Sequence, residues 1–267
     1  MNGTLSKDRT TLTGDIRLHP LFHSRFLKRD RDVLVYLPPA YEEAEKRRFP
    51  VLYLHDGQNI FDGETSFVRG QEWEVDETAE RLIRDRSIKP VIIVGIHNAG
   101  EDRIDEYTPT YDDRHKHGGS ADQYGRFIVE ELKPFIDRTY RTWRAARSTG
   151  LGGSSLGGLV SLYLWHRYPH VFGRLAVMSP SIWWDHRVIL RMLQEADHPQ
   201  KPKLWLDIGT QEGQHHTHDT RLLRDLLLSK GWREGRDLKY VEARGHGHNE
   251  WSWARRVPQM LRFLFPK

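Results

Sequence analysis

The chain has 267 residues, which is long for one ordinary domain and short for two, although α/β sheets often reach about 250 residues undivided. Hydrophobic residues make up 37% and charged residues 29%, with 9 Trp, 10 Tyr and 10 Phe, which excludes intrinsic disorder. The 41 basic and 37 acidic side chains leave a net charge of +4, spread along the chain, so no nucleic-acid partner is indicated. We therefore predict a single globular domain over residues 1–267.

The lack of cysteine excludes disulfides, thiolate metal sites and a cysteine nucleophile. The first nine residues lack the apolar core of a signal peptide, and no stretch approaches the roughly 20 apolar residues of a membrane span. These features predict a cytoplasmic protein with no membrane partner. The sequence does not indicate an oligomeric state.

Strand-like and helix-like segments alternate along most of the chain, after an antiparallel opening over residues 12–18 and 25–37. Short apolar runs bounded by turn residues predict strands at 33–37, 49–55, 89–96, 174–178, 203–208 and 238–242. Helical spacing of apolar residues predicts helices at 74–84, from 120 to 135, around 222–227 with a stop at Gly231, and from 251 to 265. This order is typical of an α/β fold with a mainly parallel central sheet and helices on both faces.

Two details of this pattern concern local structure. Ser120 followed by Gln123 resembles a capping box at the start of a helix. Residues 98–119 cluster Gly, Asp and His without periodicity, which predicts an inserted irregular loop. Loops of this length are usually binding loops or lids.

A nucleophile motif follows the strand-like segment near residue 150. Gly153-Ser-Ser-Leu-Gly157 matches G-x-S-x-G between a strand and an apolar helix, as the nucleophile elbow of an α/β-hydrolase fold requires. Flanking glycines let neighbouring backbone pass close to the strained turn. Ser155 is the predicted nucleophile, with Ser154 as its rival, and the backbone N–H of Leu156 at the helix start would face an oxyanion.

The base of such a fold follows its last strand. Here His246 and His248 compete for the role in Gly245-His-Gly-His-Asn-Glu250, and the one not used would be a solvated loop histidine. His246 lies between two glycines, which position a ring poorly, whereas His248 lies at the start of the final helix, which can anchor it.

The acid should follow the preceding strand. Glu212 lies at the tip of the loop Gly209-Thr-Gln-Glu-Gly213 and is the first choice. Asp219 is a second candidate that could instead be a helix N-cap, and Asp207 is a third that lies inside the strand.

A metal site is a weaker interpretation of the same region. Histidines crowd the segment after Glu212, and the two loop histidines could come near them, but neither HExxH nor a cysteine partner accompanies them: His215, His216, His218 and Asp219.

The second oxyanion donor in such folds comes from the loop after the strand that ends here at His55. Asp56-Gly-Gln-Asn59 occupies that loop, and Gly57 lets the backbone bend so that an amide points into the site. The backbone N–H of Gln58 is the predicted donor.

Several motifs, taken together and in order, resemble the "Putative esterase" family of α/β-hydrolases, which is similar to esterase D, enterochelin, feruloyl and acetylxylan esterases and mycolyltransferases. They are Tyr36-Leu-Pro-Pro-Ala-Tyr41, Pro50-Val-Leu-Tyr-Leu-His-Asp-Gly-Gln-Asn59, Glu106-Tyr-Thr-Pro109, Glu131-Leu-Lys-Pro-Phe-Ile-Asp137, Gly153-Ser-Ser-Leu-Gly-Gly158, Ser179-Pro-Ser-Ile-Trp-Trp184 and His248-Asn-Glu250.

The resemblance implies specific roles for residues of this chain. It implies Ser155 as nucleophile, His248 as base and the N–H groups of Leu156 and Gln58 as oxyanion donors. It supports Glu212 less firmly, because members vary between Asp and Glu at the acid. Asp56 stands where many relatives have glycine.

The resulting hypothesis is a serine carboxylic-ester hydrolase with a Ser-His-Glu/Asp triad, an acyl-enzyme and no cofactor, acting on a small-molecule ester. The alternatives are an acyltransferase with the same triad, a metal-dependent hydrolase that uses the histidine-rich loop, and a non-catalytic binding module.

The substrate is indicated only by residue type. Trp183 and Trp184 follow a strand end, where α/β sheets bind ligands, and Arg103 lies in the long loop. Aromatic side chains suit sugars or aryl groups and arginine suits an acidic substrate, but the tryptophans could equally be core and Arg103 a surface charge.

Overall fold

The structure is a computed structural model that describes residues 10–39, 41–43, 45–197 and 199–267. Its strands are β1 (Asp15–Phe22), β2 (Arg31–Leu37), β3 (Val51–His55), β4 (Ile92–Ile96), β5 (Tyr111–Asp112), β6 (His117–Gly118), β7 (Thr149–Ser154), β8 (Arg174–Met178), β9 (Lys203–Gly209) and β10 (Leu238–Ala243). Its α-helices are α1 (Val75–Arg84), α2 (Arg103–Glu106), α3 (Ala121–Arg126), α4 (Lys133–Thr139), α5 (Leu156–Arg167), α6 (Trp184–Glu195), α7 (Gln214–Ser229), α8 (Glu250–Ala254) and α9 (Val257–Leu264).

Within the described part of the chain, eight strands form one sheet in the order β1-β2-β4-β3-β7-β8-β9-β10. The pairs β1·β2 and β2·β4 are antiparallel, and from β4 to β10 all neighbouring strands are parallel. The predicted antiparallel opening and mainly parallel sheet are both confirmed. Parallel strands place their carboxyl ends at one edge, so the loops after β3, β7, β8, β9 and β10 gather there.

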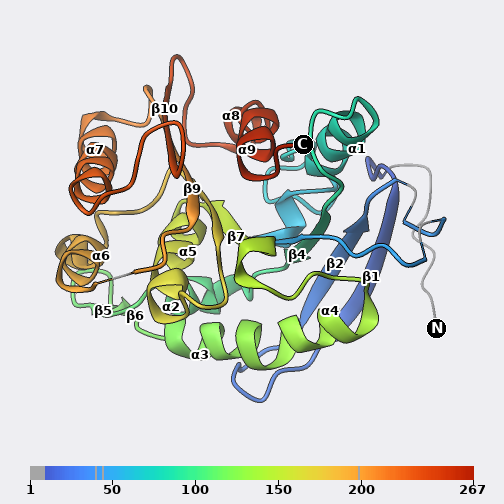
Figure 1. Ribbon diagram of the computed structural model, residues 1–267. Coiled ribbons are helices and arrows are strands. Elements are labelled where there is room, and N and C mark those ends of the chain that lie inside the picture. The colour runs from blue at the N-terminus through green and yellow to red at the C-terminus, as the bar shows by residue number, and fades with distance from the viewer. Residues whose placement is uncertain (1–9, 40, 44, 198) are drawn as a thin grey trace.

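Two hydrophobic clusters cover the two faces of this sheet, as expected of parallel strands buried on both sides. Strand β3 shows the alternation, because Val51 and Tyr53 belong to one cluster and Leu52 and Leu54 to the other. The first cluster includes residues of α3 to α7, whereas the second includes residues of α1, α8 and α9, and Figure 1 shows the two sets of helices on opposite sides of the sheet. Helices therefore cover both faces, as predicted.

The segment 98–119 is not a featureless loop. It contains a 3-10 turn (Gly100–Asp102), helix α2 and the short paired strands β5 and β6. The buried ion pair between Arg31 and Glu106, with N···O distances of 2.8 and 2.9 Å, ties α2 to β2. Elements of two to four residues carry no sequence periodicity, which is why the pattern predicted irregular structure.

Two predicted local features are wrong. The final helix is interrupted, with α8 ending at Ala254 and α9 starting at Val257, because Pro258 lacks an N–H and is suited to the first turn of a new helix. Helix α3 does begin after Ser120, but the Ser120 side chain makes no capping hydrogen bond, so the capping box is absent.

No helix in the described residues combines the length and the hydrophobicity that crossing a membrane requires.

Candidate active site

Ser155 lies between the last residue of β7 and the first residue of α5. Its backbone has φ 57° and ψ −122°, a region that L residues rarely adopt. A side chain at Gly153 would approach backbone atoms of Gly157 and the Cβ of His55 to 3.1 Å, so the turn is crowded there and glycine fits it best. The predicted elbow is thus present in its geometry, and the strained turn presents Ser155 at the carboxyl edge of the sheet.

The loop after β3 faces the same region. Asp56 has a left-handed backbone conformation, with φ 56° and ψ 46°, and Gly57 begins a 3-10 turn that continues to Asn59. A side chain on Gly57 would lie 2.5 Å from the backbone carbon of Gly95, so only glycine lets this loop pass over β4. Gln58 lines the same cavity as Ser155.

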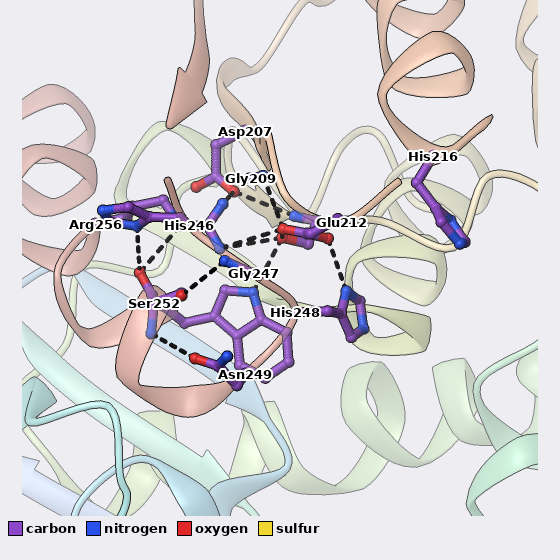
Figure 2. A network of polar contacts seen from close by, with 12 residues as sticks. Asp207, Gly209, Glu212, His216, His246, Gly247, His248, Asn249, Ser252 and Arg256 are labelled. Carbon is purple, nitrogen blue, oxygen red and sulfur yellow. Dashed lines mark hydrogen bonds and ion pairs between the residues drawn. The ribbon is translucent and has the colours of Figure 1, made fainter. Parts of the chain in front are cut away.

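His248 and Glu212 form a close pair. The Nδ1 atom of His248 lies 2.7 Å from Oε2 of Glu212, as Figure 2 shows. The Glu212 side chain is 1% exposed and the His248 side chain is 43% exposed. The ring of His248 stands edge-on to Trp253 at 5.0 Å between centroids, and Asn249 caps α8 by accepting from the backbone N–H of Ser252 at 2.9 Å. The residue after His248 is therefore fixed at a helix start.

Three donors surround the Glu212 carboxylate. Its Oε1 atom accepts from the backbone N–H of Gly209 at 2.7 Å and from the hydroxyl of Ser179 at 2.6 Å. Burial works to raise the pKa of Glu212, but the hydrogen bonds from His248, Ser179 and Gly209 outweigh it, and the pKa lies below its ordinary value. The carboxylate is therefore ionised, which is the form that can stabilise an imidazolium.

The other acid candidates have different partners. Asp207 is fully buried in β9, where it pairs with Arg256 at 2.6 Å, and burial raises its pKa to about 6. Asp219 pairs with Arg187 at 2.7 Å and lies in the interior of α7, not at its N-cap, because the helix already begins at Gln214. The structure thus brings Glu212, and neither aspartate, to His248.

The structure also locates the rival nucleophile, Ser154, and the rival base, His246. Ser154 is buried as the last residue of β7, although it lines the cavity. His246 directs Nδ1 toward the backbone oxygen of Ser252 at 3.2 Å and packs near Trp251. Figure 2 shows His246 on the far side of Glu212 from His248.

A cavity of about 370 Å³ joins the predicted residues. Its lining includes Ser155, His248, Gln58 and Arg103, together with the exposed apolar side chains of Phe67 and Val68, and it also includes Asp56, Asn59, Asn98, Ser154, Asn249, Glu250 and Trp253. The cavity therefore combines the elbow, the base and a mixed polar and apolar wall.

Arg103 lies in this cavity as part of a polar group. Its guanidinium binds both carboxylate oxygens of Asp56, at 2.6 and 2.7 Å, and Asn98 donates to the same carboxylate at 2.7 Å. Burial works to raise the pKa of Asp56, but Arg103 and Asn98 outweigh it and lower the pKa. Asp56 is thus an ionised anchor for Arg103, whose side chain remains 25% exposed.

The tryptophan pair lies elsewhere. Trp184 is 1% exposed, donates its indole N–H to the backbone oxygen of Thr110 at 3.0 Å and stacks on His115. Trp183 is half-buried against the same histidine. Neither tryptophan is among the residues that line the Ser155 cavity, so the pair packs segment 98–119 onto α6 and is not the predicted aromatic platform.

The histidine-rich segment forms the exposed first turns of α7, where His215 and His218, three residues apart, share a helix face and His216 does not face His215. Among the described residues, the group of metal-ligand type whose atoms lie within 4.8 Å of one another is Glu72, Asp76 and Glu77, and it contains no histidine.

Sequence reasoning gave no role to the segment Ser179-Pro180-Ser181. The hydroxyl of Ser179 contacts Glu212, and the hydroxyl of Ser181 lies 3.3 Å from that of Ser155. The family-like motif Ser179-Pro-Ser-Ile-Trp-Trp184 was the one sequence feature that pointed to this segment. Its two serines look like ordinary turn residues, so the motif did not indicate a role for either.

Comparison with known proteins gives a family model and several relatives. A family model described as "Putative esterase" matches residues 24–264. The uncharacterized protein YbbA of Bacillus subtilis (strain 168) is 26% identical over 250 residues, 89% of this chain and 94% of that protein. Ferri-bacillibactin esterase BesA of the same strain is 29% identical over 226 residues, 75% of this chain and 73% of that protein.

Solved structures share the fold. The IroE-like serine hydrolase from Shewanella oneidensis superposes with a TM-score of 0.72 at 24% identity and covers 94% of this chain and 80% of that chain. The predicted α/β-hydrolase fold is confirmed.

Proposed function

Because the chain belongs to the "Putative esterase" family and is a carboxylic-ester hydrolase, we propose that it acts through a serine triad of Ser155, His248 and Glu212. The observation that carries the proposal is the 2.7 Å contact between His248 Nδ1 and the buried, ionised Glu212. His248 lines the same cavity as Ser155, the serine of the strained elbow. A carboxylate on Nδ1 fixes the imidazole tautomer and leaves Nε2 as the base.

In the proposed reaction, Nε2 of His248 takes the hydroxyl proton of Ser155 as the oxygen attacks the ester carbonyl carbon. Glu212 stabilises the imidazolium that forms. The carbonyl oxygen becomes an oxyanion, which accepts hydrogen bonds from the backbone N–H groups of Leu156 and Gln58. The imidazolium then protonates the departing alcohol and leaves an acyl-enzyme, which a water molecule, activated by the same base, hydrolyses to the acid.

The cavity wall suggests the substrate class. Phe67 and Val68 present apolar surface, and Arg103 presents donors held in place by Asp56. An ester with an aromatic, oxygen-rich acyl group matches both, because its ring packs on the apolar wall and its oxygens accept from the guanidinium. The endo-1,4-beta-xylanase/feruloyl esterase of Xylanibacter ruminicola, which is similar to this chain, carries a name that fits this class.

The Glu212→Gln variant tests the proposed acid. We expect turnover to fall by about 10³ to 10⁴, because a glutamine cannot hold the imidazole tautomer or stabilise the imidazolium. Hydrolysis of p-nitrophenyl, feruloyl and siderophore trilactone esters by the purified variant provides the measurement. Asp219→Asn is the matched control, and its turnover should stay within about threefold of that of the unmodified protein. If instead Asp219→Asn loses most of its turnover and Glu212→Gln keeps nearly all of it, Asp219 is the acid.

A serine mechanism also predicts the response to chelation. Incubation with EDTA followed by gel filtration should leave the rate of hydrolysis within about twofold of the untreated rate, because no step above uses a metal. The measurement is paired with metal analysis of the purified protein. Stoichiometric zinc, with activity lost on its removal and regained on its return, would support the metal-dependent alternative instead.

A further inference from the structure

The segment that follows β8 contacts both the proposed nucleophile and the proposed acid. Ser179 has a φ of 43°, which is strained for a residue other than glycine, and it is 2% exposed. Ser181, two residues later, donates its backbone N–H to the backbone oxygen of Ser155 at 3.0 Å. A strained, buried serine at a site of chemistry is a candidate for a functional role, because surrounding contacts must hold it in that conformation.

The partners of the Ser179 hydroxyl determine where its proton points. Its oxygen accepts from the indole N–H of Trp253 at 3.0 Å and from Nη2 of Arg256 at 3.1 Å. A hydroxyl has two acceptor positions and one proton, and both of those donors lack any acceptor capacity. The proton of Ser179 is therefore left for Oε1 of Glu212, 2.6 Å away.

Arg256 is itself held in place by other groups. Its Nη1 atom binds Asp207 at 2.6 Å and its Nε donates to the backbone oxygen of Ser252 at 3.2 Å, as Figure 2 shows. Asp207 also accepts from the indole of Trp205 and from the backbone N–H of Ser179. The side chains of Arg256 and Asp207 are 3% and 0% exposed, so solvent does not compete for these bonds.

We infer that Ser179 is a positioning residue of the ester hydrolysis proposed above. Its hydroxyl, oriented by Trp253 and Arg256, binds Oε1 of Glu212 and so turns Oε2 toward His248. The inference rests on the proposed triad and assigns a function to a residue that touches neither the substrate nor the reacting atoms.

The charged groups that face the Glu212–His248 pair set the sign of the expected pH effect. Asp207 and Arg256 lie on the side of Glu212, and Glu250 lies near His248. Loss of a donor to Glu212 makes its carboxylate more basic, so the pair binds its proton more tightly. The acid limb of the kcat/KM profile should then move to higher pH.

The test compares two variants that lack the hydroxyl. Ser179→Gly relieves the backbone strain and Ser179→Ala keeps it, so both should fold, with the glycine variant at the higher melting temperature. We expect both to lower kcat by about ten- to hundredfold, the usual worth of a hydrogen bond to a charged group, and KM to change by less than about threefold. The acid limb should rise by about one pH unit in both.

Ser161→Ala is the matched control, because Ser161 is also a fully buried serine but its hydroxyl donates to the backbone oxygen of Gly157 within α5. It should leave kcat within about twofold and the pH profile unmoved. If the Ser179 variants behave like Ser161→Ala, the inference is wrong. If Ser155→Ala itself retains hydrolysis, the proposed triad fails instead, so the two failures are distinguishable.

Discussion

Replacing Ser155 by alanine is expected to lower the turnover of ester hydrolysis by about 10⁶ while the protein remains folded. The loss is this large because triad members act as a unit, so removing the nucleophile removes nearly all of their contribution. Initial rates with an activated ester, measured against the uncatalysed rate in buffer, give the size of the loss. Circular dichroism of the variant verifies the fold.

Labelling by a fluorophosphonate identifies the reacting oxygen directly. The unmodified protein should carry the label on Ser155, and Ser155→Ala should carry none. Ser154→Ala serves as the neighbouring control, because Ser154 is buried in β7, and it should be labelled at close to the normal rate. Mass-spectrometric detection of the label on Ser154, or activity of Ser155→Ala within tenfold of the unmodified protein, would contradict the proposed nucleophile.

Much of the fold follows from patterns that a sequence shows directly. Continuous apolar runs indicated the parallel strands, since β3 and β4 are buried at every position. The elbow was recognisable because the turn between β7 and α5 leaves little room for a side chain at Gly153, and this crowding is visible in the sequence as G-x-S-x-G. Local steric requirements of this kind can therefore be recognised from the sequence.

Contacts between residues far apart in the chain are harder to predict from the sequence. Glu212 was chosen from three acids by its place in a loop, and what separates it from Asp207 is its contact with His248, 36 residues further along the chain, which is known only from the structure. Trp184 was left open between two interpretations, because an aromatic residue after a strand can face a cavity or the core with the same sequence. Burial by segment 98–119 decides that case.

The network around Glu212 explains why one carboxylate at this edge is proposed as catalytic and its neighbour is structural. Both carboxylates accept hydrogen bonds and face Arg256, but burial raises the pKa of Asp207, whereas the hydrogen bonds to Glu212 outweigh its burial and lower its pKa. The two environments thus give the strand residue Asp207 and the loop residue Glu212 different partners, Arg256 for the first and His248 for the second. This division matches the general way in which proteins assign different roles to similar groups.

Of the two loop histidines, His248 is expected to be indispensable. His248→Ala should lower turnover by about 10⁵ to 10⁶, because without the base the hydroxyl of Ser155 stays protonated and Glu212 has no imidazolium to stabilise. His246→Ala should retain at least a tenth of the activity. Paired measurements of kcat and KM on the two variants, each verified as folded by circular dichroism, give the comparison.

The difference between the two histidines comes from their contacts. His246 faces the backbone oxygen of Ser252 and packs near Trp251, so its loss removes a contact within the loop that precedes α8 and leaves the Glu212–His248 pair in place. Its backbone oxygen accepts from the N–H of Gln211 at 2.9 Å, a bond that holds the acid loop against the base loop and does not depend on the side chain. A His246→Ala variant without activity beside an active His248→Ala would transfer the role of general base to His246.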